Sequence, residues 1–392
     1  MRGETIVCLS AADWEGMWAR AQQFMSIFAG QGNRVLYVDP PITYLSPLKN
    51  PELRKQPHDH VRSVDDRIRV YSPPVLLPFG NIYRVVNRFN QRILAAGLKR
   101  VCRELGWQPT IYWTYLPNTV DLPLSRDLLL VYDCADEHTA FPGLIKRETV
   151  AGMERELFGR ANVTLTSAGE LYQSKKDQAP DLLLAPNGAD VTHFNKALQP
   201  ELEIPPEIAS LPRPVAGYVG AVSRWLDQEL LAAAARTHPE WSLVLIGPVD
   251  TDVTILKALP NVHLLGRKSY ATLPSYLKGL DLALIPFKIN ELTRGVNPVK
   301  LYEYLAAGKP VVSSDLPEVR PFQPAIAVYR NQPEFLKKME EELAKDSPQK
   351  AAGRLRLAEE NSWQARAAVI EEEIARKLGV ERRKQGDGSF YS

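Results

Sequence analysis

The stretch that decides the fold is DLALIPFKINELTRGVNPVKLYEYLAAGKPVVSS, residues 281–314. Its two ends, 281–287 and 310–314, are short apolar runs of the kind that form buried strands. Between them, the pattern of 298–307 predicts a short packed helix. This segment begins at a proline, which suits the first helical position. Strand, helix and strand in this order predict a parallel βαβ unit, because parallel neighbours need a helical crossover.

The same alternation extends over most of the chain. Uninterrupted apolar strands that alternate with helices predict an α/β protein with mainly parallel sheets, covered on both faces. Further strands are expected at 5–10, 34–40, 68–72, 110–115, 128–133, 163–167, 181–186, 215–220, 242–247, 261–266 and 325–330, and helices near 17–30, 81–105, 143–159, 227–237, 272–279 and within 332–378.

A proline-rich stretch divides this alternation into two doubly wound, Rossmann-like domains. Residues 195–214 carry five prolines and no sustained periodicity, which is typical of a linker. We expect one domain at 1–194, a second at 215–362, and a frayed tail at 381–392. Two such domains would face each other across a cleft, and ligands would bind beyond the carboxyl ends of the strands.

Composition and charge exclude several classes of protein. The chain has 392 residues and a formal net charge of +2, with no nucleic-acid recognition module. No run approaches the roughly 18 apolar residues of a membrane-spanning helix. Cys8, Cys102 and Cys134 are too scattered for a disulfide framework or a zinc site, so we expect a cytoplasmic protein, at most attached to the inner face of the plasma membrane. A nicotinamide dehydrogenase is not supported, because no G-x-G-x-x-G follows the first strand.

The helix at 298–307 carries the features of a phosphate site. With Pro298 at the first position, the amides of Val299 and Lys300 are free to bind a phosphate beside the lysine ammonium. Glu303 lies one turn further on, where its carboxylate could bind a ribose diol; the alternative is an exposed salt bridge with Lys300. Gly220, at the end of 215–220, would let a phosphate approach closely, or serves only a tight turn.

In the first domain, 128–141 ends in a cluster of polar residues after a buried strand. Asp133, Asp136, Glu137 and His138 could bind a metal ion, or could hydrogen-bond sugar hydroxyls with Asp133 or His138 near the reacting centre. We favour the second interpretation, because neighbouring side chains on one loop rarely converge on one ion. Asp136 could instead cap the following helix.

Two further segments carry candidate contacts. In the loop 10–20, Asp13, Trp14 and Arg20 could bind an acceptor sugar or a phosphate, although Trp14 fits a core position equally well. The helix 81–104 has a basic stripe beside an apolar one, which suits either an anionic membrane surface or an ordinary surface helix. The stripe consists of Arg84, Arg88, Arg92, Lys99 and Arg103, and the neighbouring apolar face of Ile82, Val86, Phe89 and Ile93.

Several motifs together resemble a known family. PVKLYEYLAAGKPVV after DLALIPF, APNGADVTHF (185–194) and GYVGAVSRWLDQELL (217–231) are similar to segments of GT-B glycosyltransferases. The resemblance is to the retaining family 4 branch, and within it to enzymes of bacterial surface polysaccharides such as teichuronic acid. GRKSY (266–270) falls where that family holds the nucleobase, and SWQARAAVIEEEI resembles its helix that crosses back to the first domain, here within 363–380.

The resemblance implies roles for individual residues and no metal or other cofactor. Glu303 would bind the ribose hydroxyls, and Arg224 with Lys300 the diphosphate. The family often has a second glutamate eight residues before the first, where this chain has Gly295, and Asp227 stands near the place of an expected lysine. Arg294 or Lys300 would supply the missing cation. The donor-binding set is Gly220, Arg224, Arg267, Tyr270, Arg294, Asn297, Pro298, Val299, Lys300 and Glu303, with Arg267 and Tyr270 at the base or in ordinary loop packing.

The resemblance therefore implies an enzyme that moves a sugar from a nucleotide-diphosphate donor, a UDP-sugar, to a saccharide or lipid-linked acceptor. The expected catalytic residues are Asp133, His138 and Lys300, and the expected acceptor contacts are Asp13, Trp14, Arg20 and Asp136. Two alternatives stay open at this point. One is a non-catalytic nucleotide-sugar-binding or scaffold protein of a polysaccharide assembly complex, and the other is a GT-B-type sugar-nucleotide epimerase.

Overall fold

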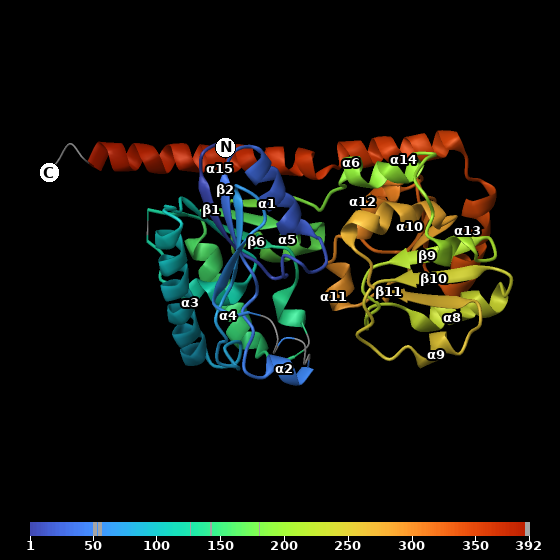
Figure 1. Cartoon of the computed structure of the whole chain (residues 1–392), viewed down its shortest axis with the longest axis horizontal. Coiled ribbons are helices and arrows are strands. Elements are labelled where there is room, and N and C mark those ends of the chain that lie inside the picture. The colour runs from blue at the N-terminus through green and yellow to red at the C-terminus, as the bar shows by residue number, and fades with distance from the viewer. Residues whose placement is uncertain (50–52, 54–56, 126, 142, 180, 389–392) are drawn as a thin grey trace. The chain divides into compact units, whose positions relative to one another are not determined.

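The computed structural model describes residues 1–49, 53, 57–125, 127–141, 143–179 and 181–388, and these form two compact units. The first unit comprises Met1–Pro186 and Ala367–Ser392, and the second Asn187–Arg366. Each unit is built around its own mostly parallel sheet (Figure 1). The expected α/β class with two doubly wound domains is therefore confirmed.

The first unit has an eight-stranded sheet in the order β3-β4-β2-β1-β5-β6-β7-β8. Every pairing is parallel except that of β3 with β4. The edge strand β3 was not predicted, because its sequence, HVRS, has no apolar run. The strands are β1 (Thr5–Leu9), β2 (Arg34–Val38), β3 (His60–Ser63), β4 (Ile68–Ser72), β5 (Ile111–Thr114), β6 (Leu129–Cys134), β7 (Val163–Thr166) and β8 (Leu182–Leu184).

Helices cover both faces of this sheet. On one face, α3 and α4 contribute apolar side chains to a core that includes Val7 and Leu130. On the other, Phe24 and Phe28 of α1 pack on Trp113, and Figure 1 shows α1 on the side opposite α3. The helices are α1 (Arg20–Gly30), α2 (Ser46–Lys49), α3 (Arg84–Glu104), α4 (Arg147–Arg160) and α5 (Gly169–Lys175), with the 3-10 helices η2 (Pro117–Asp121) and η3 (His138–Ala140).

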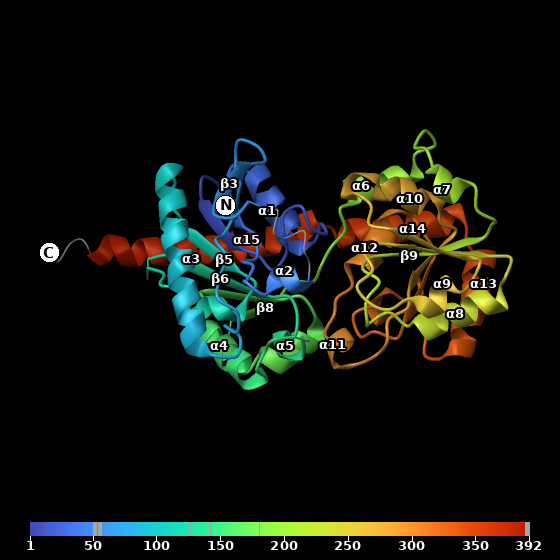
Figure 2. The same cartoon turned by 60° about the horizontal axis from the view of Figure 1, so that its bottom comes forward.

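The second unit has a six-stranded, fully parallel sheet in the order β11-β10-β9-β12-β13-β14. Figures 1 and 2 show helices on both of its faces, with α10, α12 and α14 on the side opposite α8 and α9. Its strands are β9 (Val215–Val219), β10 (Ser242–Ile246), β11 (Val262–Gly266), β12 (Leu282–Ile285), β13 (Val311–Ser314) and β14 (Ala327–Tyr329). Its helices are α6 (Val191–Phe194), α7 (Pro206–Ala209), α8 (Gln228–Thr237), α9 (Thr254–Lys257), α10 (Leu273–Gly279), α11 (Glu291–Arg294), α12 (Val299–Ala306), α13 (Gln332–Ala344) and α14 (Pro348–Glu360), with η4 (Asn195–Leu198), η5 (Tyr270–Thr272) and η6 (Arg320–Phe322).

The last helix, α15 (Trp363–Gly388), begins in the second unit and continues in the first. In the first unit Glu371 accepts a hydrogen bond from Gln31 at 3.0 Å, and Lys377 pairs with Asp181 at 2.8 Å. The expected tail, 381–392, is helical as far as Gly388, and 389–392 lie outside the described residues. The proline-rich stretch 195–214 contains η4 and α7 and groups with the second unit.

Among the helices that the structure describes, none combines the length and the apolar character needed to cross a bilayer.

Candidate active site

The helix α12 presents its first turn and one buried carboxylate on the same segment. It begins at Val299, so Pro298 is the N-cap residue (φ −74°, ψ 112°) and not the first helical residue as predicted. Because the ψ of Pro298 is extended and not helical, Pro298 still belongs to the preceding loop, and the helix starts at the next residue. The Tyr304 hydroxyl accepts a hydrogen bond from the Val219 amide at 2.8 Å, which fixes α12 against the end of β9.

Glu303 is a buried acid with no partner in the part of the chain that the structure describes. Its side chain is 8% exposed, and within the described residues its carboxylate forms no hydrogen bond or ion pair with the protein. Burial raises the pKa of Glu303 from 4.5 to about 7; nearby Lys300 lowers it and Asp190 raises it further. An exposed salt bridge with Lys300 is therefore wrong. A buried carboxylate that lacks a partner is costly and is typical of a functional site.

The end of β9 lies against Lys300 of the same helix. Gly220 has φ +154°, and a Cβ built on it would lie 2.3 Å from Cε of Lys300 and 2.6 Å from the Tyr218 hydroxyl. Gly247, after β10, has φ +153°, and its Cβ would lie 2.0 Å from the backbone oxygen of Gly220. Only glycines fit here, and their absent side chains bring the backbone, the lysine and the start of α12 together. Such a group of donors can bind a diphosphate.

The predicted arginines of the second unit are exposed and on loops or a short helix. Arg224 follows β9, Arg267 follows β11, and Arg294 ends α11. The structure gives no contact that assigns them to a ligand, so their roles stay predictions. Asp227 caps α8, where its carboxylate accepts a hydrogen bond from the Leu230 amide at 3.1 Å. Helix capping therefore explains why an aspartate stands here, near the position where the resemblance leads one to expect a lysine.

Asn297 joins two of the motifs that were far apart in the sequence. Its side-chain oxygen accepts a hydrogen bond from the Asn187 amide (3.1 Å), and its carbonyl accepts one from the Asn187 side chain (2.7 Å). Its own amide group donates to Glu318 (2.8 Å). The side chain thus holds the loop before α12 in place, and direct donor binding by Asn297 stays a prediction.

Tyr270 packs on a neighbouring motif. Its ring stacks on His193 at 4.3 Å with an interplanar angle of 10°, and its hydroxyl donates to Asp190 at 3.1 Å. One face of the ring is therefore covered by the protein, in line with the packing interpretation of this residue. Asp190 was not singled out from the sequence, although it follows the PNGA run directly and its charge acts on Glu303.

In the first unit, two of the predicted site residues are paired with each other. Asp133 is completely buried at the end of β6, and both of its oxygens accept hydrogen bonds from Nε of Arg20, at 2.9 and 3.0 Å. The Arg20 guanidinium also reaches the Pro186 carbonyl at 3.4 Å and lies over the Phe24 ring at 4.7 Å. This is a buried ion pair between α1 and β6, and the catalytic role of Asp133 and the acceptor role of Arg20 stay predictions.

Asp136 and His138 line a cavity of about 490 Å³ in the first unit. Burial lowers the pKa of His138, although Asp136 opposes this shift, and burial raises the pKa of Asp136. Nε2 of His138 is buried and has no hydrogen-bond partner in the described chain. Arg20, Asn81, Asn118 and Phe141 line the same cavity. A neutral imidazole here can exchange a proton with a bound hydroxyl.

The neighbour Glu137 has a different role. Its side chain accepts a hydrogen bond from the Thr139 amide and so caps η3. The helix cap that was considered for Asp136 is therefore formed by Glu137. Its carboxylate also pairs with Lys175 at 2.9 Å, and Lys175 pairs with Glu154 at 2.8 Å. Within the part of the chain that the structure describes, no three His, Cys, Asp or Glu side chains are grouped so as to hold a metal ion.

Trp14 and Asp13 lie on the loop after β1. Trp14 is buried and packs edge-on against Trp18 and Tyr37, at 5.2 and 4.9 Å between ring centroids. This is the core position considered above, and stacking of Trp14 on an acceptor sugar stays a prediction. The backbone oxygen of Asp13 accepts hydrogen bonds from Gly16 and Gln22.

The helix α3 differs from the expected pattern. Its outward apolar residues are Val85 (75% exposed) and Phe89 (52% exposed), whereas Ile82, Val86 and Ile93 are half-buried. Arg84 is bound to Asp121 and Glu156, both at 2.7 Å, and Nε of Arg88 lies 3.6 Å from Asp121. The other basic residues of the predicted stripe, Arg92, Lys99 and Arg103, are exposed.

Sequence reasoning missed two polar residues that line the His138 cavity, Asn118 of η2 and Asn81. Asn118 comes from LPNT, which follows β5 directly, and Asn81 comes from the loop before α3. The signal was available for Asn118, because the carboxyl end of a strand in a parallel sheet is where ligands bind. No comparable signal marks Asn81.

Known proteins resemble this chain in sequence and in fold. Residues 213–345 match the family described as glycosyl transferases group 1. Over 210 residues the chain is 29% identical to TuaH of Bacillus subtilis, described as a teichuronic acid biosynthesis glycosyltransferase. That match covers 50% of this chain and 52% of TuaH, so the chain matches about half the length of this curated relative.

Solved structures share the fold over nearly the whole chain. Sucrose-phosphate synthase from Thermosynechococcus elongatus has a TM-score of 0.70 at 13% identity, covering 96% of this chain and 99% of that one. HepE of Anabaena, in complex with UDP and glucose, has a TM-score of 0.60 at 15% identity, and the match covers 94% of this chain and 99% of HepE. The catalytic domain of starch synthase IV from Arabidopsis thaliana, bound to ADP and acarbose, has a TM-score of 0.65 at 11% identity. That match covers 97% of this chain and 100% of the starch synthase chain. The second unit therefore matches the group 1 glycosyl transferases, and the chain shares the two-domain fold of these solved structures.

Proposed function

We propose that the protein transfers a sugar from a UDP-sugar to a saccharide or lipid-linked saccharide in cell-surface polysaccharide synthesis, with retention of configuration. The observation that carries the proposal is Glu303, a buried carboxylate that has no hydrogen-bond or ion-pair partner among the described residues. It lies on the helix whose first turn faces Gly220. The complex of HepE with UDP and glucose supports the choice of donor, and the description of TuaH supports the pathway.

The donor would bind through charge and oriented amides. The Glu303 carboxylate accepts hydrogen bonds from the two ribose hydroxyls, which replace the partners that the protein does not supply. The ammonium of Lys300 and the amides of Val299 and Lys300 bind the diphosphate over Gly220. When the glycosidic bond breaks, negative charge grows on the departing UDP, and these fixed donors stabilise it without a metal ion. Arg224 and Arg294 add positive charge.

The acceptor would bind in the first unit, in the cavity that holds Asp136 and His138. The free Nε2 of His138 can hydrogen-bond the reacting hydroxyl, and the neutral form of the ring can accept its proton. Burial lowers the pKa of His138, which favours the neutral imidazole that this role needs. Asp136 supplies a second polar contact to the acceptor.

The protein would work in the cytoplasm at the inner face of the plasma membrane. The outer face of α3 carries Arg92, Lys99 and Arg103 together with the exposed side chains of Val85 and Phe89. Basic residues near an anionic bilayer contribute about 1 kcal/mol each, and exposed apolar side chains add to the binding. A lipid-linked acceptor would be met there.

The experiment that tests the donor site is a thermal-shift titration with UDP, GDP and ADP. UDP should raise the midpoint of wild type most, because a bound ligand stabilises the folded state. Lys300→Ala should lose this shift, and the matched control Lys257→Ala, an exposed lysine at the end of α9, should keep it. An equal UDP shift in all three proteins would remove the proposed diphosphate site.

One observation favours a second candidate. Gly295 stands where the resembled family often has a glutamate, so a donor-binding protein without transferase activity, or an epimerase, would explain the missing carboxylate. UDP-sugar binding without UDP release across a panel of acceptors would favour the binding protein. Conversion of the donor sugar with no acceptor present would favour the epimerase.

A further inference from the structure

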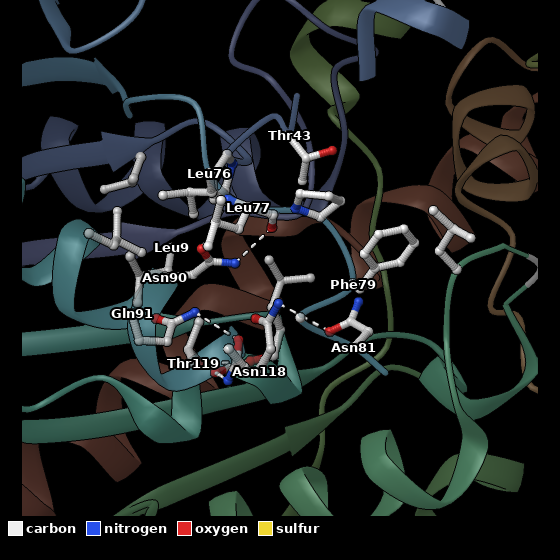
Figure 3. Close-up of a pocket in the computed structure, with 18 of the residues that line it drawn as sticks. Leu9, Thr43, Leu76, Leu77, Phe79, Asn81, Asn90, Gln91, Asn118 and Thr119 are labelled. Carbon is white, nitrogen blue, oxygen red and sulfur yellow. Dashed lines mark hydrogen bonds between the residues drawn. The ribbon is translucent and has the colours of Figure 1, made fainter. Parts of the chain in front are cut away.

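A second cavity in the first unit lies beside the one that holds His138. It has a volume of about 300 Å³ and is lined by the ends of β1 and β2, the loop 76–81 and the first turns of α3 (Figure 3). The size is at the lower end of the range of small-molecule sites, roughly 300–1,000 Å³. Five residues line both cavities, so the two are neighbours: Ser10, Asn81, Leu116, Asn118 and Ile145.

The wall formed by α3 carries three amide side chains, those of Asn87, Asn90 and Gln91, beside Leu94. Asn90 binds the backbone of Leu77 twice, at 3.0 and 2.9 Å, and so fixes the loop (Figure 3). Gln91 is 2% exposed, and its amide nitrogen lies 3.5 Å from the Asn87 oxygen. Its Oε1 is buried and accepts no hydrogen bond within the described chain. Leaving a buried acceptor without a hydrogen bond is destabilising, and a hydroxyl of a bound ligand could supply the missing donor.

The cavity carries no positive charge. No lysine or arginine of the described residues lines it, and its one charged lining residue is Asp39. That carboxylate is already bound by the Trp14 amide, Arg62 and Ser72, at 2.8, 3.0 and 2.9 Å. A phosphate or a sugar carboxylate would lie near this charge without a cation, whereas an uncharged hydroxyl can donate to Gln91.

Phe79 is held at this cavity in a strained conformation. Its φ is +70°, in the left-handed region that is unfavourable for a residue other than glycine. The Phe79 carbonyl accepts hydrogen bonds from the Ile82 and Tyr83 amides, which hold the turn. The partly exposed ring lines the cavity together with Leu77 and Leu144. Strain of this kind persists at ligand clamps, and an aromatic face suits the apolar face of a sugar ring.

We infer that this cavity binds an uncharged pyranose unit of the acceptor, adjacent to the sugar that receives the new glycosidic bond. The inference rests on the proposed function, in which the reacting hydroxyl lies by His138 in the neighbouring cavity. Gln91 accepts a hydrogen bond from a hydroxyl of this unit, and Phe79 packs on its ring. The acceptor then contains at least two sugar units, so the enzyme extends an existing saccharide and does not place the first sugar on a lipid phosphate.

The test is saturation-transfer NMR on the full chain with methyl glycosides of glucose, galactose, mannose and N-acetylglucosamine, and with methyl glucuronide as the charged counterpart. We expect transfer to at least one neutral glycoside and at least threefold less to the glucuronide. Gln91→Leu removes the acceptor atom. Phe79→Gly removes the ring and relieves the positive φ, and this relief offsets part of the packing that is lost, so the variant should still fold. Both should lose at least two-thirds of the signal, and Gln173→Leu, on the exposed side of α5, should keep it.

Transfer that is equal for the glucuronide, unchanged in both cavity variants, or absent for every neutral glycoside would overturn the inference. UDP thermal shifts on the same samples separate this failure from that of the proposed function. A normal UDP shift in wild type with no glycoside effect rejects only the sugar cavity. No UDP shift in wild type rejects the proposed function as well.

Discussion

The two units each bury a carboxylate that the sequence singled out, and they surround it in opposite ways. Asp133 in the first unit is fully buried and receives two hydrogen bonds from Arg20. Glu303 in the second unit is 8% exposed and receives none from the described residues. A paired buried charge belongs to the folded structure, whereas an unpaired one is tolerated where a ligand completes it. The absence of a partner, more than burial, therefore distinguishes the candidate binding residue.

The largest effect should come from breaking the pair in the first unit. Asp133→Asn leaves the Arg20 charge buried and uncompensated, so the free energy of unfolding should fall by about 3–5 kcal/mol in urea denaturation. The double variant Arg20→Met/Asp133→Leu should recover most of that loss. An Asp133→Asn protein with wild-type stability and no transferase activity would show instead that Asp133 is catalytic.

Glu303 should show the opposite behaviour. Its folded pKa of about 7 lies above the ordinary 4.5, so the folded state binds the proton more tightly and loses stability as pH rises from 4.5 to 7. Glu303→Gln carries no charge at any pH. It should match wild type near pH 4.5 and exceed it at pH 8 by on the order of 3 kcal/mol. The readout is urea denaturation at both pH values, with the exposed Glu360→Gln as control. A difference that does not change with pH would contradict the unpaired state.

The next largest effect should come from replacing Gly220, the glycine at the end of β9. Gly220→Ala places a Cβ against Lys300 and Tyr218 at a positive φ, so stability should fall by about 1–2 kcal/mol and UDP affinity at least tenfold. Gly159→Ala in α4, where no atom lies within 4 Å of the new Cβ, should instead stabilise by about 0.5–1 kcal/mol. Calorimetric UDP titration and thermal melts give both numbers. Unchanged UDP affinity in Gly220→Ala would separate this glycine from the donor.

The smallest effect concerns α3. Arg92→Gln should weaken sedimentation with vesicles of phosphatidylglycerol by about 1 kcal/mol, because one basic residue leaves the exposed face. Arg84→Gln is not an equivalent change, since Arg84 is bound to Asp121 and Glu156, and it should affect stability first. Equal vesicle binding by wild type and Arg92→Gln at low salt would place the membrane contact elsewhere or remove it.

The comparison also shows which parts could be predicted from the sequence. The predicted donor site depends on one short helix and one strand end, so local rules could place Lys300 and Glu303 on that helix and Gly220 at the strand end, with an error of one residue at Pro298. Their binding of a donor stays a prediction. The pairing of Arg20 with Asp133 joins positions 113 residues apart and could not be read from either segment. Gln91 was missed for a related reason: amide residues on a helix are usually solvated, and only the tertiary structure turns these inward.

The strand order illustrates the same limit. The apolar strands β1 and β9 were found because their runs are continuous, but β3 has only polar and half-buried residues and depends on β4 for its existence. Helix α3 was expected correctly, yet its buried face contains Asn87, Asn90 and Gln91, which no apolar periodicity marks. Burial can be predicted from the sequence where apolar residues repeat at a regular spacing within one segment. Pairings between distant segments cannot be predicted in this way.

The most direct test of the account is a calorimetric cycle at pH 8 that compares UDP with 2′,3′-dideoxy-UDP on wild type and Glu303→Gln. If Glu303 binds the ribose diol, wild type should lose about 1.5–3 kcal/mol of affinity with the dideoxy ligand, roughly 10-fold or more. Glu303→Gln should bind UDP more weakly and distinguish the two ligands much less. The same loss in both proteins would contradict the account, because the diol would then be bound by another group.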